Sequence, residues 1–458
     1  MVLAVRLVEE LHRSLLELAA VDLLARAPGA VDHQSGHEAL EPAAGEGVSL
    51  ARLDELGLDD HVRLAVDLDL QTLAQVARLV HGSPRPVPCA VGDGRRIIGS
   101  VNRGHQPDGR AVPLAEVARR LGVSVTDDVR RAARRLPLRF PRSYVDQLQR
   151  AGALDLLARI GWPDPEETVP DPGGLDDPVG EAGRAPHPLV RRKYPDRAIL
   201  LAASRCHFYC RFCFRAGVDI EPSPAELARA VGTIARLARD GVREVILSGG
   251  DPLTLDDHRL GALLADLGRV EGIATVRIHT RAPVHQPERV SESLVETLTG
   301  SARRPPWVVI HVSHPAELHP AFDEAVARLR GHGIPLLSQS VLLAGVNDAP
   351  ERLAALFGGL YERGVKPYYL HHPDRVPGTA RFHVAIERGR GIVRALRALL
   401  PGPAMPSYVV DLPDGSGKVP VDWLEPDGTG HWRVGLPGGK VLRYEERPAT
   451  GRSAEPPP

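Results

Sequence analysis

The chain has 458 residues, of which 43% are hydrophobic and 25% charged, an ordinary globular composition with enough length for two or three domains. Its 57 Lys and Arg residues against 58 Asp and Glu residues leave a formal net charge of −1. No overall field therefore attracts nucleic acid or an anionic membrane, and we expect small-molecule partners instead.

Residues 1–135 are predicted to form a mainly helical N-terminal extension, whose role the sequence leaves open. Charged residues interrupt the apolar stretches of residues 1–27 at helical intervals, which argues against a signal peptide or a membrane span. With no export signal and only four cysteines, the expected compartment is a reducing cytoplasm. Residues 113–124 could be the first helix and turn of a helix-turn-helix, but amphipathic helices followed by Gly are common, so we do not expect DNA binding.

Residues 136–195 are predicted to be a lead-in segment, with a Pro/Asp/Gly-rich loop at 162–188 that could cover the mouth of the next domain. Residues 196–400 alternate short apolar runs with longer amphipathic stretches, which is the pattern of βα units around a parallel sheet. We therefore expect an α/β fold, an open partial (β/α)6 barrel. Its predicted strands are residues 197–203, 244–248, 275–280, 308–312, 336–342 and 367–371, and its predicted helices include residues 225–239, 257–267, 321–330 and 352–362.

Three of the four cysteines, Cys206, Cys210 and Cys213, follow the first predicted strand with the spacing C-x3-C-x2-C. A structural zinc site usually takes four ligands, whereas three thiolates can bind three irons of a [4Fe–4S] cluster and leave the fourth iron open. The alternatives are a buried trio of thiols, or a zinc site completed by Cys89 or a histidine. Clustered thiols in a reducing compartment favour the iron–sulfur cluster.

Two further motifs are candidate binding sites, although each is a weaker signal than the cysteine spacing. Ser248, Gly249, Gly250 and Asp251 end the second strand at the rim where the cysteines lie, so the glycines could admit a ligand and the acid could accept from an amine. Lys418 stands on a Gly-rich turn, from which it could reach the aldehyde of pyridoxal phosphate (PLP). Taken alone, the glycine pair is more often a plain turn and the lysine more often solvent-exposed.

The cysteine spacing, with Phe212 before the last cysteine, resembles the radical S-adenosylmethionine (SAM) enzymes. Residues 136–445 as a whole resemble the lysine 2,3-aminomutase family, which uses SAM, a [4Fe–4S] cluster and PLP to move an amino group from C2 to C3. The matching segments occur in family order and at family spacing: residues 193–197, 206–215, 248–251, 311–315, 339–343, 368–374 and 408–418.

This resemblance implies a role for each motif. Lys418 is the PLP lysine, Arg197 faces the PLP phosphate, Lys193 belongs to the same cofactor site, and Arg215 grips the substrate α-carboxylate through its planar fork. The 248–251 motif takes the amino group of SAM, and His311 and Gln339 contact SAM. An electron, from a donor such as flavodoxin or ferredoxin, cleaves SAM into methionine and a 5′-deoxyadenosyl radical, which takes a hydrogen from C3 of the substrate. We also expect a homo-oligomer.

Asp374 and Asp411 indicate the substrate. Family members that act on lysine carry an acid at both positions to pair the distal ammonium, whereas glutamate-acting members replace them. Each acid alone could be a cap or a loop residue, but the pair favours conversion of L-lysine to L-β-lysine.

Some features depart from the family pattern or leave alternatives open. The C-terminal cysteines of a zinc site in some members are absent, Ser313 stands where many members have Asn, and Ala216 replaces one of a basic pair. Arg281 and residues 136–143 are closer to a branch that acts on a lysine of elongation factor P, but that branch generally lacks the Asp411 segment. The remaining alternatives are an arginine 2,3-aminomutase and an iron–sulfur redox regulator, which would not need Lys418. Residues 401–446 form the predicted C-terminal PLP-lysine segment, and residues 447–458 a disordered tail.

Overall fold

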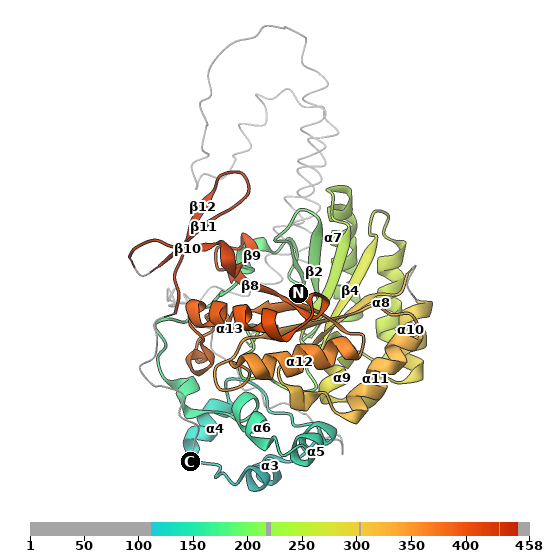
Figure 1. The fold of residues 1–458 in the computed structure, drawn as a ribbon. Helices are drawn as coiled ribbons and strands as arrows, with labels where there is room; N and C mark the ends of the chain where they lie inside the picture. The colour runs from blue at the N-terminus through green and yellow to red at the C-terminus, as the bar shows by residue number, and fades with distance from the viewer. Residues whose placement is uncertain (1–110, 217–220, 302–303, 430, 448–458) are drawn as a thin grey trace, which may run out of the picture. The chain divides into compact units, whose positions relative to one another are not determined.

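Figure 1 shows a computed structural model of the chain, which describes residues 111–216, 221–301, 304–429 and 431–447. Predictions for residues 1–110, for Cys89 within them and for the tail from residue 448 lie outside the described residues. No helix in the described ranges is long and apolar enough to cross a membrane.

A sheet of nine strands, ordered β1 to β9 as they occur along the chain, forms the centre of the fold. Strands β2 to β8 are parallel neighbours, while β1 and β9 pair antiparallel at the two edges. The strands are β1 Val190–Arg191, β2 Arg197–Ala203, β3 Glu244–Gly249, β4 Thr275–Thr280, β5 Trp307–His311, β6 Leu336–Val341, β7 Lys366–His371, β8 Ser407–Leu412 and β9 Gly417–Pro420.

The predicted barrel is confirmed, with one addition. Each of the six predicted strands matches β2 to β7 to within one residue at either end. A seventh parallel strand, β8, belongs to the sheet, although the sequence indicated only a separate C-terminal segment there. The side chains of β3 and β5 are mostly buried apolar residues, as expected for parallel strands covered on both faces.

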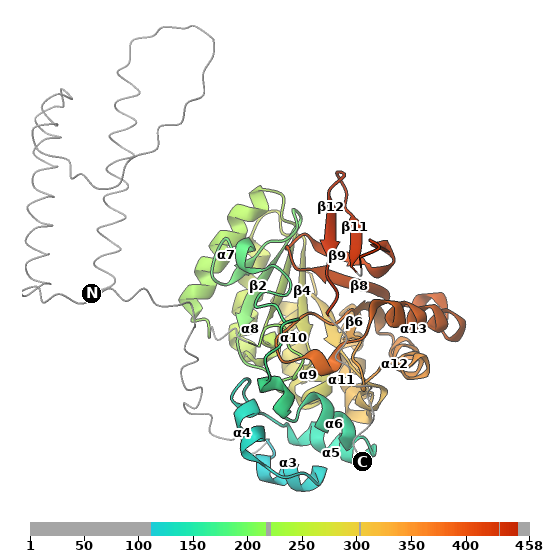
Figure 2. The ribbon, with the colours of Figure 1, turned by 90° about the vertical axis from the view of Figure 1, so that its left-hand side faces the viewer.

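Helices connect the parallel strands and cover the outer face of the sheet (Figures 1 and 2). They are α7 Pro224–Arg239, α8 Asp257–Arg269, α9 Ala282–His285, α10 Glu292–Gly300, α11 Pro320–Gly331, α12 Pro350–Glu362 and α13 Ile386–Leu399. The start of α7 shows why these segments are helical: Ser223 and Glu226 form a capping box around Pro224 at the first turn. Gly389 of α13 leaves room for the Tyr408 ring of β8, because a Cβ there would lie 2.0 Å from the phenol oxygen.

Four short helices precede the barrel and lie beside one another at one end of it (Figures 1 and 2). They are α3 Leu114–Leu121, α4 Asp127–Ala133, α5 Arg142–Arg150 and α6 Leu154–Ile160. Val117 and Ala118 of α3, in the segment considered as a helix-turn-helix, are buried in the same hydrophobic core as α6 and the barrel. Packing into that core accounts for the apolar spacing of residues 113–124.

The lead-in loop docks on the C-terminal part of the chain. Within residues 162–188 the short 3-10 helices η3 Pro165–Thr168 and η4 Ala182–Arg184 interrupt a series of turns. Gly180 has a φ of +63°, and a Cβ on it would lie 2.3 Å from the backbone nitrogen of Gly415, in the turn between β8 and β9. Only glycine permits this contact, which fixes the loop beside the β8–β9 hairpin.

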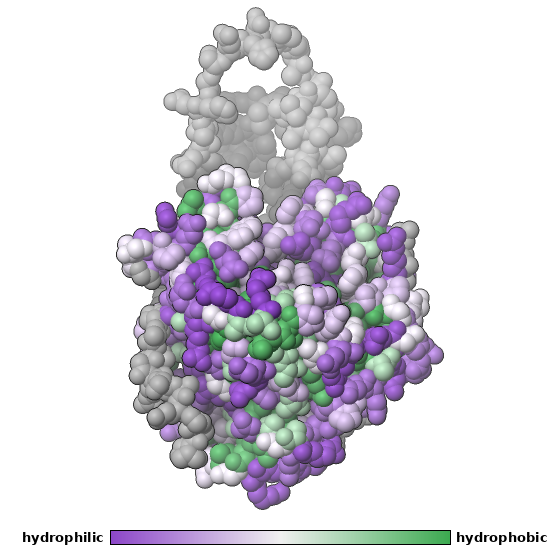
Figure 3. Space-filling model, in the orientation of Figure 1, coloured by the Kyte–Doolittle hydropathy of each residue, from purple (hydrophilic) through white to green (hydrophobic). Residues whose placement is uncertain are grey.

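A separate antiparallel sheet of β10 Leu424–Pro426, β11 Trp432–Gly435 and β12 Val441–Tyr444 follows the hairpin. Its Trp432 and Tyr444 side chains are buried. On the face shown in Figure 3 hydrophilic residues predominate and hydrophobic areas are small and separate, so the apolar residues lie mainly in the core.

Candidate active site

One cavity of about 270 Å³ brings together every site residue predicted from the sequence. It opens at the carboxyl ends of the parallel strands, where ligands of such sheets gather. Its lining includes the three cysteines after β2, the Ser248–Asp251 motif after β3, His311 of β5, Gln339 of β6, Asp374 after β7, and Asp411 and Lys418 of the β8–β9 hairpin. Lys193, Arg197 and Arg215 complete the set.

The thiols of Cys206, Cys210 and Cys213 are free and line one side of the cavity. Burial raises the pKa of all three, that of Cys210 to about 11, so a metal has to displace the thiol protons on binding. In the described ranges no three His, Cys, Asp or Glu side chains converge as they would around a single ion. A cubic cluster does not need such convergence, since each thiolate binds a different iron.

The glycine pair after β3 serves the cysteine loop directly. A Cβ on Gly249, whose φ is +111°, would lie 2.3 Å from the carbonyl oxygen of Ala203, and a Cβ on Gly250 would lie 2.2 Å from that of Arg205. The backbone nitrogen of Gly250 also donates to the Ala203 carbonyl at 2.6 Å. The glycines therefore let two backbone segments touch, which positions the loop that begins at Cys206.

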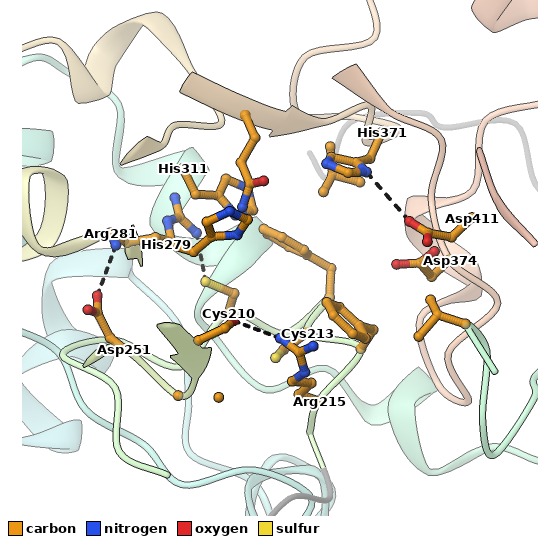
Figure 4. A pocket seen from close by; sticks show the side chains of 18 of the residues that line it. Cys210, Cys213, Arg215, Asp251, His279, Arg281, His311, His371, Asp374 and Asp411 are labelled. Carbon is orange, nitrogen blue, oxygen red and sulfur yellow. Dashed lines mark hydrogen bonds and ion pairs between the residues drawn. The ribbon is translucent and has the colours of Figure 1, made fainter. Parts of the chain in front are cut away.

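Asp251 connects the ends of β3 and β4. Its carboxylate accepts from the Thr280 hydroxyl at 2.7 Å and from the Leu253 amide at 3.0 Å. It also accepts from the Arg281 amide at 2.9 Å (Figure 4). Most of its acceptor capacity is thus taken by the protein. Its predicted contact with the amino group of SAM stays a prediction.

Lys418 and Asp411 face each other across the β8–β9 hairpin, where they are direct register partners. The Lys418 ammonium lies 3.1 Å from Asp411, and the Lys193 ammonium lies 3.2 Å from the same carboxylate. Although burial opposes ionisation of Asp411, the two lysines lower its pKa below the ordinary value. Burial likewise opposes charge on Lys418, but Asp411 outweighs it and raises the lysine pKa.

Asp374 lies close to Asp411 at the same end of the cavity (Figure 4). Burial and the neighbouring charge of Asp411 raise its pKa to about 8. The two carboxylates are therefore shifted in opposite directions: the lysines favour the ionised form of Asp411, whereas burial and the Asp411 charge favour the protonated form of Asp374.

Arg215 is held at two sides. Its Nη1 donates to the Ser248 hydroxyl at 2.8 Å, and its Nη2 donates to Glu181 at 2.6 Å. Glu181 comes from the lead-in loop and also lines the cavity, so that loop does reach the mouth of the barrel. No motif marked Glu181 in the sequence, because its position depends on the path of an irregular loop.

Arg197 and Tyr194 form a second group beside Lys418. The Arg197 guanidinium stacks on the Tyr194 ring, 3.8 Å from its centroid, and pairs with Asp196 at 3.0 Å. The Tyr194 hydroxyl accepts from the backbone amide of Lys418 at 2.7 Å. The β1–β2 lead-in thus contacts the segment that carries the predicted PLP lysine.

Two half-buried histidines, at the ends of β4 and β5, each have one buried ring nitrogen without a partner among the described residues. The Nε2 atoms of His279 and His311 have no hydrogen-bond partner among the described residues, and both side chains line the cavity. Burial holds their pKa values well below the ordinary one, so both rings are neutral. Unpaired buried nitrogens at a cavity wall fit a polar ligand. His279 was missed in the sequence, where it looks like one more polar residue in a strand.

Comparisons with known proteins agree with this geometry. Residues 201–357 match the model of the radical SAM superfamily. The L-lysine 2,3-aminomutase of Escherichia coli (strain K12) is 37% identical over 296 residues, which are 64% of this chain and 85% of that protein. The L-lysine 2,3-aminomutase of Methanococcus maripaludis is 36% identical over 54% of this chain and 57% of its own length. The glutamate 2,3-aminomutase of Clostridioides difficile (strain 630) is 33% identical over 60% of this chain and 65% of its own length.

Proposed function

Because the chain belongs to the lysine 2,3-aminomutase family of radical SAM enzymes, we propose that it converts L-lysine to L-β-lysine by moving the amino group from C2 to C3. It is an enzyme of the isomerase class, and its family uses a [4Fe–4S] cluster, SAM and PLP. When bound, the cluster and SAM would supply a 5′-deoxyadenosyl radical, and PLP would supply the aldehyde that binds the migrating amino group.

The choice of lysine rests chiefly on the acidic end of the cavity. Asp411 already binds two ammonium groups, that of Lys193 at 3.2 Å and that of Lys418 at 3.1 Å. A carboxylate that binds ammonium groups in this way suits the ε-ammonium of lysine, whereas the side chain of glutamate would bring a third carboxylate beside Asp374 and Asp411. Once Lys418 binds PLP and Lys193 faces a phosphate, Asp411 becomes available to the substrate.

The remaining residues supply binding and positioning. The three cysteines hold the cluster, and the unpaired nitrogens of His279 and His311, with Gln339, bind SAM at the ends of β4 to β6. Lys193 and Arg197 neutralise the PLP phosphate beside Lys418. Arg215, kept in place by Ser248 and Glu181, turns its free N–H groups toward the substrate carboxylate. Bound cofactors and substrate would fill the cavity and so limit the access of water and oxygen to the radical.

We further propose that the enzyme works in a reducing cytoplasm with a flavodoxin-like or ferredoxin-like electron donor. The half-buried, free thiols of the cysteine loop support a reducing compartment. A homo-oligomer stays a prediction.

The proposal is tested by anaerobic turnover of the reconstituted enzyme with lysine, arginine and glutamate, in the wild type and in Asp374→Asn and Asp411→Asn. We expect lysine to be the best wild-type substrate, and each variant to lower kcat/KM for lysine at least about a hundredfold, because an ammonium loses a buried partner. Asp414→Asn, in the exposed turn of the same hairpin, serves as the control. Better turnover of arginine, or unchanged lysine turnover in both cavity variants, would show that the acids do not select lysine.

A further inference from the structure

A buried chain of polar side chains runs from helix α5 to the cysteine loop. The Tyr144 hydroxyl donates to Glu317 Oε1 at 2.8 Å, and Arg281 Nη2 donates to the same oxygen at 2.9 Å. Arg281 Nη1 then donates to Cys210 Sγ at 2.6 Å. Tyr144 and Glu317 are fully buried and Arg281 is 9% exposed, so water screens this chain little.

The protein orients Glu317 independently of Arg281. Its second oxygen, Oε2, accepts from the backbone amides of Ser313 at 2.6 Å and His314 at 3.2 Å, in the capping box of η7 Pro315–Glu317. The carboxylate therefore cannot turn away from the guanidinium without losing two hydrogen bonds.

Hydrogen bonds hold both the backbone and the guanidinium end of Arg281. Its backbone amide donates to Asp251, and Nη2 lies within 3.3 Å of the Ser313 hydroxyl as well as contacting Glu317. Together with the ion pair, these contacts aim Nη1 at the sulfur of Cys210, as Figure 4 shows.

A neutral thiol does not require this arrangement. Burying the Arg281 guanidinium is costly, but Glu317 alone would compensate its charge. The contact of Nη1 with Cys210 therefore adds no stability while the sulfur is protonated. A thiolate bound to iron is a charged acceptor and does benefit. In addition, the buried Nε of Arg281 has no hydrogen-bond partner among the described residues, and the sulfides of a cluster are acceptors that could take it.

We propose that Arg281 is a positioning residue that hydrogen-bonds the cluster ligand Cys210 and raises the reduction potential of the [4Fe–4S] cluster. Reduction adds one electron, and hence one negative charge, to the cluster. A fixed cation in a medium of low dielectric constant stabilises the more negative state more strongly, and hydrogen bonds to the sulfurs shift cluster potentials in the same direction. The proposal rests on the cluster of the proposed function but not on which amino acid is the substrate.

The test is a potentiometric titration of the reconstituted full-length protein with dithionite as the reductant, followed by electron paramagnetic resonance of the reduced cluster. Arg281→Gln should move the midpoint to a more negative potential, with at least a tenfold lower equilibrium constant for reduction, or about 59 mV for one electron. Arg281→Lys keeps the positive charge but loses the two-pronged guanidinium group, so it should shift the midpoint potential less far in the negative direction.

Glu317→Gln provides a result of opposite sign. It removes the compensating negative charge and leaves the cation, so the midpoint should move to a more positive potential. A purely structural role for the chain would not reverse the sign between the two variants. Arg277→Gln is the matched control, because Arg277 is an equally buried arginine of β4 that pairs with Glu244 at 2.6 Å, away from the cysteines.

Iron content is measured for each variant before its potential. If Arg281→Gln binds no cluster, the midpoint potential of Arg281→Lys is the test instead. An unchanged midpoint potential in Arg281→Lys then overturns the proposal. The proposal also fails if Arg281→Gln shifts the midpoint no more than Arg277→Gln does, or if Glu317→Gln shifts it in the same direction as Arg281→Gln. If the enzyme prefers a substrate other than lysine, all these potentials stay the same. A wrong lysine assignment can therefore be told apart from a wrong role for Arg281.

Discussion

Among single side chains, the two neighbouring aspartates differ most in their environment. Asp411 is paired with Lys193 and Lys418, whereas the half-buried Asp374 side chain has no hydrogen bond or ion pair among the described residues, and its pKa is raised to about 8. A cation that arrives beside Asp374 would favour its ionised form. Binding of lysine is therefore expected to be coupled to loss of a proton from Asp374.

This coupling predicts a pH dependence. The affinity of the PLP-loaded protein for lysine, measured without SAM by the change in PLP absorbance, should rise as the pH increases through about 8, because the ionised fraction of Asp374 rises there. Norleucine has the same α-amino group but no ε-ammonium, so its affinity should not show the rise that ionisation of Asp374 causes. In the Asp374→Asn protein the affinities for lysine and norleucine should change with pH in parallel across this range. Parallel pH profiles for lysine and norleucine in the wild type would contradict the coupling.

Among structural elements, the loop after β3 and the cysteine loop depend on each other. The carbonyl oxygens of Ala203 and Arg205 occupy the space that side chains at positions 249 and 250 would need. Gly250→Ala should therefore displace the start of the cysteine loop, and we expect it to lower iron content several-fold while PLP binding at Lys418 persists.

Gly232→Ala is the control for this substitution. Gly232 lies in α7, and a Cβ there would meet no atom within 4 Å, so the protein should keep its iron and unfold at the same or a slightly higher temperature. Iron and PLP are measured on the same samples. Full iron content in Gly250→Ala would mean that the cysteine loop tolerates the change and that the glycine has another role.

How far the sequence predicts the elements depends on how regular their patterns are. The short apolar or β-branched runs of β2 to β7 are bounded by turns, so those strands could be predicted almost to the residue. Helix α13 was not predicted, because Gly389 and Gly391 interrupt its pattern, and Gly389 is needed only for contact with Tyr408. Lys418 was expected on a turn, but it lies in strand β9 directly after that turn.

The same distinction applies to the site. Residues that follow a strand, such as Cys206, Asp251 and Asp374, could be expected at one rim, because the ends of parallel strands meet there. Glu181 and the partners of Arg281 could not, since their contacts join segments that are far apart in the chain and follow irregular paths. Tyr144 and Glu317 illustrate this, being separated by 173 positions.

Across the chain as a whole, the predicted cluster and PLP sites come from segments near opposite edges of the nine-stranded sheet. The cysteines follow β2, while Lys418 lies on β9, and the two meet only through the common cavity. Lys418→Ala should therefore lose covalently bound PLP but keep the full iron content. Mass spectrometry after borohydride reduction should find the pyridoxyl group on Lys418 in the wild type. An adduct on Lys193 or another lysine would overturn the assignment.

The proposed reaction is tested most directly by following the amino nitrogen itself. The reconstituted enzyme is incubated anaerobically with SAM, dithionite and L-lysine that carries 15N only at its α-amino group, and the products are examined by NMR. We predict L-β-lysine with 15N on C3 and unlabelled nitrogen at the ε position, formed only when SAM is present. Cleavage of SAM without any β-lysine, or a β-amino acid formed from another amino acid but not from lysine, would contradict the account.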